Sequence, residues 1–278
     1  MRLAESYPVK IVYEVLAFPR SSFYYRPVKQ GDERLRSDLL EEAGVWPSYG
    51  YRRITEELRR KGWRVNSKRI RRLMREMSLQ IKPRAQKQRT TDNRHDLGRY
   101  PDLIRKLEIT RPDQVWAADI TYIRLRREFV YLAVIMDIFT RAVRGWHLTR
   151  RLDHQLTLTA LEKALEQGKP EIHHSDQGIQ YAALPYVKRL QSVEMQIGMA
   201  DVGKPTQNPH VERLIRTIKE EEVDLSEYED AQDAYRQIGS FMEDVYTYKR
   251  IHSCLEYLTP MEYELQWQSI QAEELVVI

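Results

Sequence analysis

Residues 114–123 read Gln114-Val115-Trp116-Ala117-Ala118-Asp119-Ile120-Thr121-Tyr122-Ile123. They predict an apolar strand that contains one acid, and this strand is the starting point for the fold prediction. Residues 128–137 (EFVYLAVIMD) are equally rich in β-formers, and a charged turn separates the two stretches, so they predict a β-hairpin. An ionised carboxylate inside such a strand is costly unless it is paired or bound to a cation. Asp119 is therefore either a functional acid or a residue that faces solvent on an edge strand.

The residues that follow the hairpin predict alternating strands and helices. The expected order is strand 142–149, helix 156–166, strand 171–175, helix 184–190, strand 194–199 and helix 209–222. Three antiparallel strands followed by this alternation indicate an α/β fold with a mixed sheet. We expect this α/β core over residues 109–225 and a helical extension over 226–278.

The amino-terminal part predicts a small helical unit over residues 1–81. Three prolines break any long helix in residues 1–31, and helices are expected over 32–43, around Ile54 and Leu58, and after a cap at Asn66 or Ser67. Short helices with Gly-containing turns and a basic last helix are typical of a helix-turn-helix-like DNA-binding unit, although a bundle with a solvated basic face has the same pattern. The expected DNA contacts are Arg52, Arg53, Lys68, Arg69, Arg71 and Arg72.

Charge is unevenly distributed over the 278 residues, a length that suggests about two domains. Residues 52–94 hold 16 basic and four acidic side chains, whereas residues 201–278 hold 17 acidic and seven basic ones. This asymmetry favours double-stranded DNA as a partner at the basic end. Residues 82–108 are expected to be a basic linker.

Other features exclude membrane and disulfide-rich classes. The longest apolar run, residues 129–136, has eight residues, whereas about 20 are needed to span a bilayer. Cys254 is the only cysteine, which excludes an internal disulfide and a thiolate-clustered zinc site. We expect no membrane partner and a cytoplasmic, nucleoid-associated location.

Three acids stand out as candidate catalytic residues and metal ligands: Asp119, Asp176 and Glu212. Asp176 follows a predicted strand, and Glu212 lies in the first turns of a predicted helix, 35 residues after Asp176. Singly, Asp176 is a typical turn aspartate before glycine, and Glu212 is a typical acid near a helix amino terminus. Together, the fold order can bring all three into one pocket.

Oxygen ligands of this kind suit Mg²⁺ or Mn²⁺, and two such ions can assist phosphoryl transfer. Arg216 and Lys219 follow Glu212 at helical spacing, so they are expected to lie beside it and bind DNA phosphates. Lys204, in the preceding proline loop, is a further candidate phosphate contact. Zinc at His173 and His174 is the weaker alternative, because no third soft ligand lies nearby in the sequence.

Four stretches together resemble the second-frame (OrfB) transposases of bacterial insertion sequences, whose core is similar to retroviral integrase. These are residues 49–54 (YGYRRI), 116–122 (WAADITY), 174–181 (HSDQGIQY) and 257–260 (YLTP) with the preceding His252-Ser253. The Asp, Asp, 35 residues, Glu pattern is the family's own, as is a basic residue seven positions after the glutamate. One loop departs from the family's usual sequence: Gly203-Lys204-Pro205-Thr206-Gln207-Asn208.

The resemblance implies a ribonuclease-H-like mixed-sheet core and Mg²⁺-dependent cutting and joining of DNA. Asp119, Asp176 and Glu212 would hold two ions, and the freed 3′-OH of the element's end would attack target DNA. It also implies a homo-oligomer that pairs two ends and an upstream-frame protein as a candidate partner. Two alternatives remain: a non-catalytic DNA-binding regulator derived from a transposase, and a nuclease on the same fold.

Overall fold

The structure is a computed structural model that describes residues 9–15, 32–81, 100–201 and 207–276. Its core is a five-stranded sheet with the order β3-β2-β1-β4-β5. The strands are β1 (Val115–Arg124), β2 (Phe129–Asp137), β3 (Val143–Thr149), β4 (Ile172–Ser175) and β5 (Gln196–Met199). All five match expected strands to within two residues at each end.

The sheet is mixed, as the element order predicted. β1 pairs antiparallel with β2, and β2 antiparallel with β3, whereas β4 runs parallel to β1 and β5 parallel to β4. The parallel pairing of β4 ends at Ala118 and Ser175, immediately before the two candidate aspartates. This mixed sheet with helices on both faces confirms the expected α/β, ribonuclease-H-like core.

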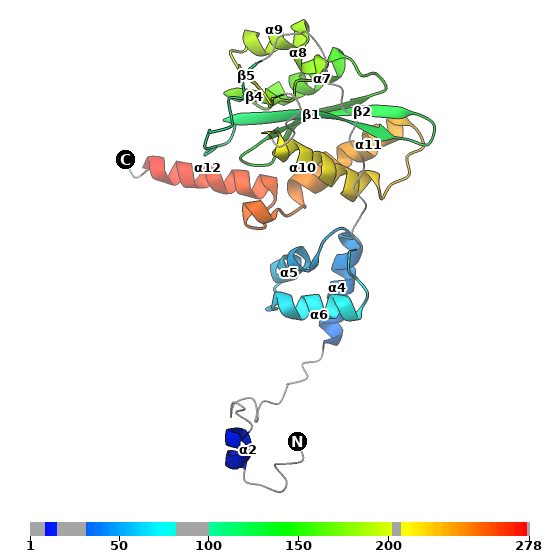
Figure 1. Ribbon diagram of the computed structural model, residues 1–278, viewed down its shortest axis with the longest axis vertical. Helices are drawn as coiled ribbons and strands as arrows, with labels where there is room; N and C mark the ends of the chain where they lie inside the picture. Colours follow the sequence, from blue (N-terminus) through cyan, green and yellow to red (C-terminus); the bar gives the residue numbers. More distant parts are fainter. Residues whose placement is uncertain (1–8, 16–31, 82–99, 202–206, 277–278) are drawn as a thin grey trace.

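Helices cover both faces of the sheet (Figure 1). One face packs against α7 (His154–Leu165), α8 (Ile179–Ala182) and α9 (Leu184–Ser192), and the other against α10 (Pro209–Ile218) and α11 (Ala231–Ser240). Side chains alternate between faces along a strand, so Val115 and Ala117 lie on the α10 side while Trp116 and Ala118 lie on the α7 side. Trp116 is fully buried on the α7 side.

α7 lies unusually close to β3 because Gly145 has no side chain. A Cβ atom at Gly145 would lie 2.2 Å from the carbonyl oxygen of Ala160 and 2.8 Å from the Cβ of Ala164. The helix begins where Asp153 accepts hydrogen bonds from the backbone N–H groups of Gln155 and Leu156.

Three helices form the amino-terminal unit, as expected. They are α4 (Glu33–Val45), α5 (Tyr51–Arg60) and α6 (Ser67–Glu76). Asn66 caps α6 by accepting a hydrogen bond from the N–H of Lys68, which confirms one of the two predicted caps. Gly62, with φ +90°, follows the end of α5. A short helix that the sequence analysis did not predict, α2 (Val9–Val15), precedes the unit.

The carboxyl-terminal part is helical and returns toward the amino-terminal unit (Figure 1). α10 continues into the π-helical turn η2 (Lys219–Val223), and α11 into a second π-helical turn, η3 (Phe241–Tyr246). The short 3-10 turn η4 (Ser253–Leu255) and the long helix α12 (Pro260–Val276) follow. No helix within the described ranges has both the length and the apolar character that crossing a membrane requires.

Candidate active site and nucleic-acid interface

Asp119 lies in β1, and Asp176 is the first residue after the parallel strand β4. The β1–β4 register pairs Ala118 with Ser175, so the two acids are the next residues along their strands. Within β1, Asp119 lies on the same face as Ala117, which is the face that α10 covers. Both acids are half-buried. The structure therefore brings these two predicted residues together.

The surrounding hydrogen bonds orient both carboxylates. Asp119 accepts from the N–H of Ile120 at 2.8 Å, and Asp176 accepts from the N–H of Gly178 at 3.0 Å. Asp176 thus also forms the turn before glycine that its sequence context predicted. Burial first, and then the nearby Tyr186, Asp119 and Asp176, raise the pKa of Tyr181 well above its ordinary value, so both aspartates lie within electrostatic range of one hydroxyl.

Glu212 is half-buried on α10, the helix that packs against this side of the sheet. Asn208, just before the helix, does not cap it but donates a hydrogen bond from Nδ2 to the carbonyl oxygen of Ala118 at 3.0 Å. Ala118 immediately precedes Asp119, and Glu212 lies one helical turn after Asn208. Sequence analysis missed Asn208, although an asparagine before proline at a predicted helix start was the available signal.

The carboxylates do not close into a single cluster. Among the residues that the structure describes, no group of three His, Cys, Asp or Glu side chains lies close enough to hold a metal ion. The donors at this edge are nevertheless carboxylate oxygens, which fit Mg²⁺ or Mn²⁺ by their chemistry.

The two histidines of β4 have other contacts. Burial, with a smaller contribution from His174, lowers the pKa of His173 to about 3, and its Nε2 lies 2.8 Å from the hydroxyl of Tyr186. His174 Nε2 lies 3.2 Å from the carbonyl oxygen of Gln207. Each ring is therefore engaged within the protein, which does not favour the zinc alternative.

Basic side chains continue along α10. Arg216 is exposed, and Lys219 lies over the ring of the exposed Tyr122, with its Nζ 4.8 Å from the ring centroid. Lys204 lies outside the described residues. Arg216 therefore lies on α10 with Glu212, and Lys219 begins η2, which continues that helix.

The predicted DNA contacts of the amino-terminal unit fall into two groups. Arg52, Lys68 and Arg71 are exposed, and the guanidinium of Arg71 lies 5.4 Å from the centroid of the Tyr51 ring. The others form ion pairs within the protein: Arg69 and Arg72 with Asp32, and Arg53 with Glu221. Arg72 is nevertheless exposed, because its side chain is 54% accessible. Arg52, Lys68, Arg71 and Arg72 therefore lie on the exposed surface of the unit.

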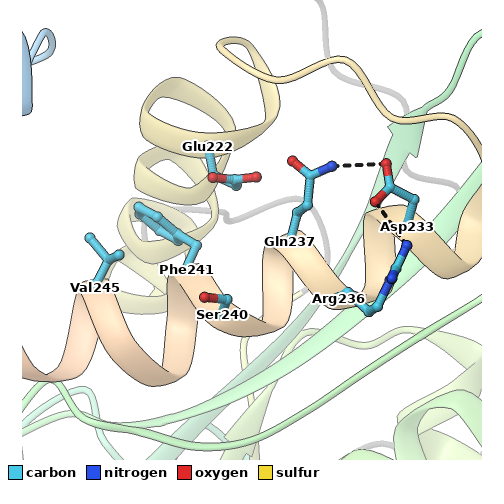
Figure 2. A pocket seen from close by; sticks show the side chains of 7 residues that line it. All are labelled: Glu222, Asp233, Arg236, Gln237, Ser240, Phe241 and Val245. Atoms are coloured by element: carbon cyan, nitrogen blue, oxygen red, sulfur yellow. Dashed lines mark hydrogen bonds and ion pairs between the residues drawn. The ribbon is translucent and has the colours of Figure 1, made fainter.

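A pocket of about 460 Å³ lies at the other end of the α10–η2 helix (Figure 2). Its lining residues come from η2, α11 and η3, and they include Glu222, Asp233, Gln237 and Phe241. It contains none of the three predicted acids, so it is separate from the candidate active site.

Comparison with known families agrees with this architecture. Residues 109–205 match the family described as integrase core domain, residues 193–260 match a second family of that description, and residues 34–87 match the family described as HTH-like domain. The fold and the site therefore define an integrase-type core that carries a helix-turn-helix-like unit.

Relatives extend over nearly the whole chain. The transposase for insertion sequence element IS904 of Lactococcus lactis subsp. lactis (strain IL1403) is 32% identical, over 86% of this chain and 97% of that protein. The putative transposase InsK for IS150 of Escherichia coli (strain K12) is 30% identical, over 95% and 96%. A solved structure of the HTLV-2 integrase catalytic core domain in complex with magnesium matches 55% of this chain and 97% of that chain, with a TM-score of 0.44 and 16% identity. The chain belongs to the transposases of bacterial insertion sequences.

Proposed function

We propose that this transposase cuts DNA at the ends of its element and joins the freed 3′-OH to target DNA, with Asp119, Asp176 and Glu212 as the catalytic carboxylates. The observation that supports this proposal is the β1–β4 register, whose last pair, Ala118 and Ser175, immediately precedes Asp119 and Asp176. The bond from Asn208 to Ala118 supports the assignment of Glu212 to the same site.

The three carboxylates would hold Mg²⁺ or Mn²⁺, with two ions expected. When bound, such ions supply charge stabilisation to the attacking and leaving oxygens of a phosphoryl transfer. Within the chain, the Gly178 N–H donates a hydrogen bond to Asp176 Oδ1, and a Cβ atom at Gly178 would lie only 3.0 Å from that oxygen, so an added side chain would displace the carboxylate by a few tenths of an ångström. Arg216 and Lys219 would bind phosphates beside the reacting bond.

A strand-transfer assay with a pre-cut transposon end and Mg²⁺ tests the proposal. The wild-type protein should join ends to target DNA, Asp176→Asn should lose at least a thousandfold of that rate, and removal of Mg²⁺ by EDTA should abolish it reversibly. Glu171→Gln is the matched control, because Glu171 precedes the same strand at its other end and forms an exposed ion pair with Arg111.

The two alternatives give different outcomes in the same assay. Cutting without joining would assign the protein to the nucleases, and DNA binding with neither reaction would assign it to the regulators. We further propose a homo-oligomer that pairs two transposon ends, a nucleoid-associated location and an upstream-frame protein as a partner; analytical ultracentrifugation with and without end DNA tests the oligomer.

A further inference from the structure

The segment Tyr49-Gly50-Tyr51-Arg52-Arg53-Ile54 lies where the amino-terminal unit meets the carboxyl-terminal part of the chain (Figure 1). Tyr49 is buried and stacks on Trp46 with ring centroids 4.6 Å apart, and the guanidinium of Arg53 lies 4.3 Å from the Tyr49 ring centroid. The Tyr49 hydroxyl accepts a hydrogen bond from the N–H of Ile251 at 3.1 Å. Ile251 itself is fully buried in the core of the three-helix unit.

An ionic network joins the same surfaces. Glu221, on η2, accepts hydrogen bonds from Arg250 Nε at 2.7 Å and Nη2 at 2.8 Å, and from Arg53 Nη1 at 3.3 Å. The Glu221 and Arg250 side chains are only 7% and 5% exposed. Burial alone would raise the pKa of Glu221, but Arg250 and Arg53 outweigh it and hold that pKa below its ordinary value.

Such a network is sensitive to geometry. A buried charge that loses its partner strongly destabilises the folded state. A bidentate arginine–carboxylate pair fixes both the distance and the relative orientation of the two side chains. η2 continues α10 without a break, so Glu221 and Glu212 lie on one continuous helical segment. A contact that fixes Glu221 against α5 therefore also fixes the amino-terminal unit relative to Glu212.

We propose that Tyr49, Arg53, Glu221 and Arg250 form a docking joint that holds the helix-turn-helix-like unit at a set position on the catalytic core. A DNA end bound by α6 is then presented to the carboxylates in a fixed geometry, and Arg53 acts as a positioning residue instead of a DNA contact. The joint's role in joining rests on the proposed function, whereas the joint itself can be measured without catalysis.

Arg53→Ala compared with Arg52→Ala separates the two roles, since the neighbours carry the same charge and only Arg53 contacts Glu221. For binding to a DNA duplex that carries the element's end, Arg53→Ala should keep Kd within about twofold of the wild-type value. The slope of log K against log salt concentration should also equal that of the wild-type protein. Arg52→Ala should weaken binding and reduce that slope by about one. Loss of one unit of slope in Arg53→Ala would make it a phosphate contact and overturn the proposal.

Hydrogen exchange of the Ile251 amide reports on the joint directly. In the full-length protein, Arg53→Ala should speed that exchange at least tenfold and lower strand transfer at least tenfold at saturating DNA. If Arg53→Ala does not fold, Tyr49→Phe is measured in its place, because it removes only the hydroxyl that accepts the hydrogen bond from the Ile251 N–H. Unchanged exchange and joining in both variants would overturn the joint. If Arg53→Ala speeds the exchange of the Ile251 amide but the wild-type protein itself does not join ends, the joint stands and only the proposed function is refuted.

Discussion

Glu57, on α5, is a half-buried acid that lacks a strong partner. Its Oε1 is buried without a hydrogen-bond partner among the described residues. Burial raises the pKa of Glu57 to about 7, and the charges of Glu42 and Glu262 add to this rise, while Arg60 opposes it. A single side chain thus makes the stability of the amino-terminal unit depend on pH.

Replacing Glu57 by Gln should remove that dependence. Because the folded-state pKa exceeds the ordinary value of 4.5, the folded protein binds this proton more tightly, and stability falls as pH rises from 4.5 to about 7. We expect the Tm of Glu57→Gln to exceed that of wild type at pH 8 and the gap to narrow toward pH 4.5. Glu56→Gln, one residue away in a pair with Arg59, is the control; parallel Tm curves for Glu57→Gln and wild type would contradict the pKa shift.

Residue types alone predicted several local roles correctly. Asp137 is buried at the end of β2, where it accepts hydrogen bonds from the N–H groups of Thr140 and Asp113, and an aspartate at a strand end favours such a turn. Asn66 was expected to cap a helix and does so. Asn208 has the same type and a similar position, but it bonds across to β1, and only the fold could reveal that partner.

At the scale of elements, the contact between β3 and α7 is the tightest packing around a glycine. Gly145→Ala should destabilise the core by about 1–3 kcal/mol, because the added methyl meets the backbone oxygen of Ala160, which cannot move without shifting the helix. Gly44→Ala is the matched control, since a Cβ atom there meets nothing within 4 Å and alanine favours its helix by about 1 kcal/mol. Urea midpoints measure both, and equal midpoints would refute the close packing.

Strands and long helices were predicted well because their hydrophobic periodicity is strong. The helix expected over 209–222 ends as regular α-helix at Ile218, and the π-helical turn that follows had no signal in the sequence. The four-residue helix α8 and the seven-residue α2 were also missed, since so few residues carry little periodicity.

At the scale of the whole molecule, the exposed basic residues of α6 should control DNA affinity. Lys68→Ala should weaken binding to any duplex and lower the salt slope by about one, because each phosphate contact releases counterions. Arg69→Ala, next along the helix, should change the slope little, since Arg69 pairs with Asp32. Fluorescence anisotropy over a range of salt concentrations measures both, and equal slopes for the two variants would contradict this division.

The charge asymmetry correctly indicated a DNA-binding amino-terminal end, but the contact between the ends of the chain could not be predicted. Tyr49 and Ile251 are separated by 202 positions, and neither residue type requires the other. Arg53 looked like its neighbour Arg52 in the sequence, and only the fold shows that Glu221 lies beside it.

The burial of Ile251 among α4, α5 and α6 has a consequence for synthesis of the protein. These helices leave the ribosome long before Ile251 has been translated, so the apolar surface around Tyr49 stays open to water for most of elongation. The three-helix unit thus emerges before the residue that completes its core. A polypeptide terminated before Ile251 would contain the helix-turn-helix-like unit with this apolar surface still exposed to water.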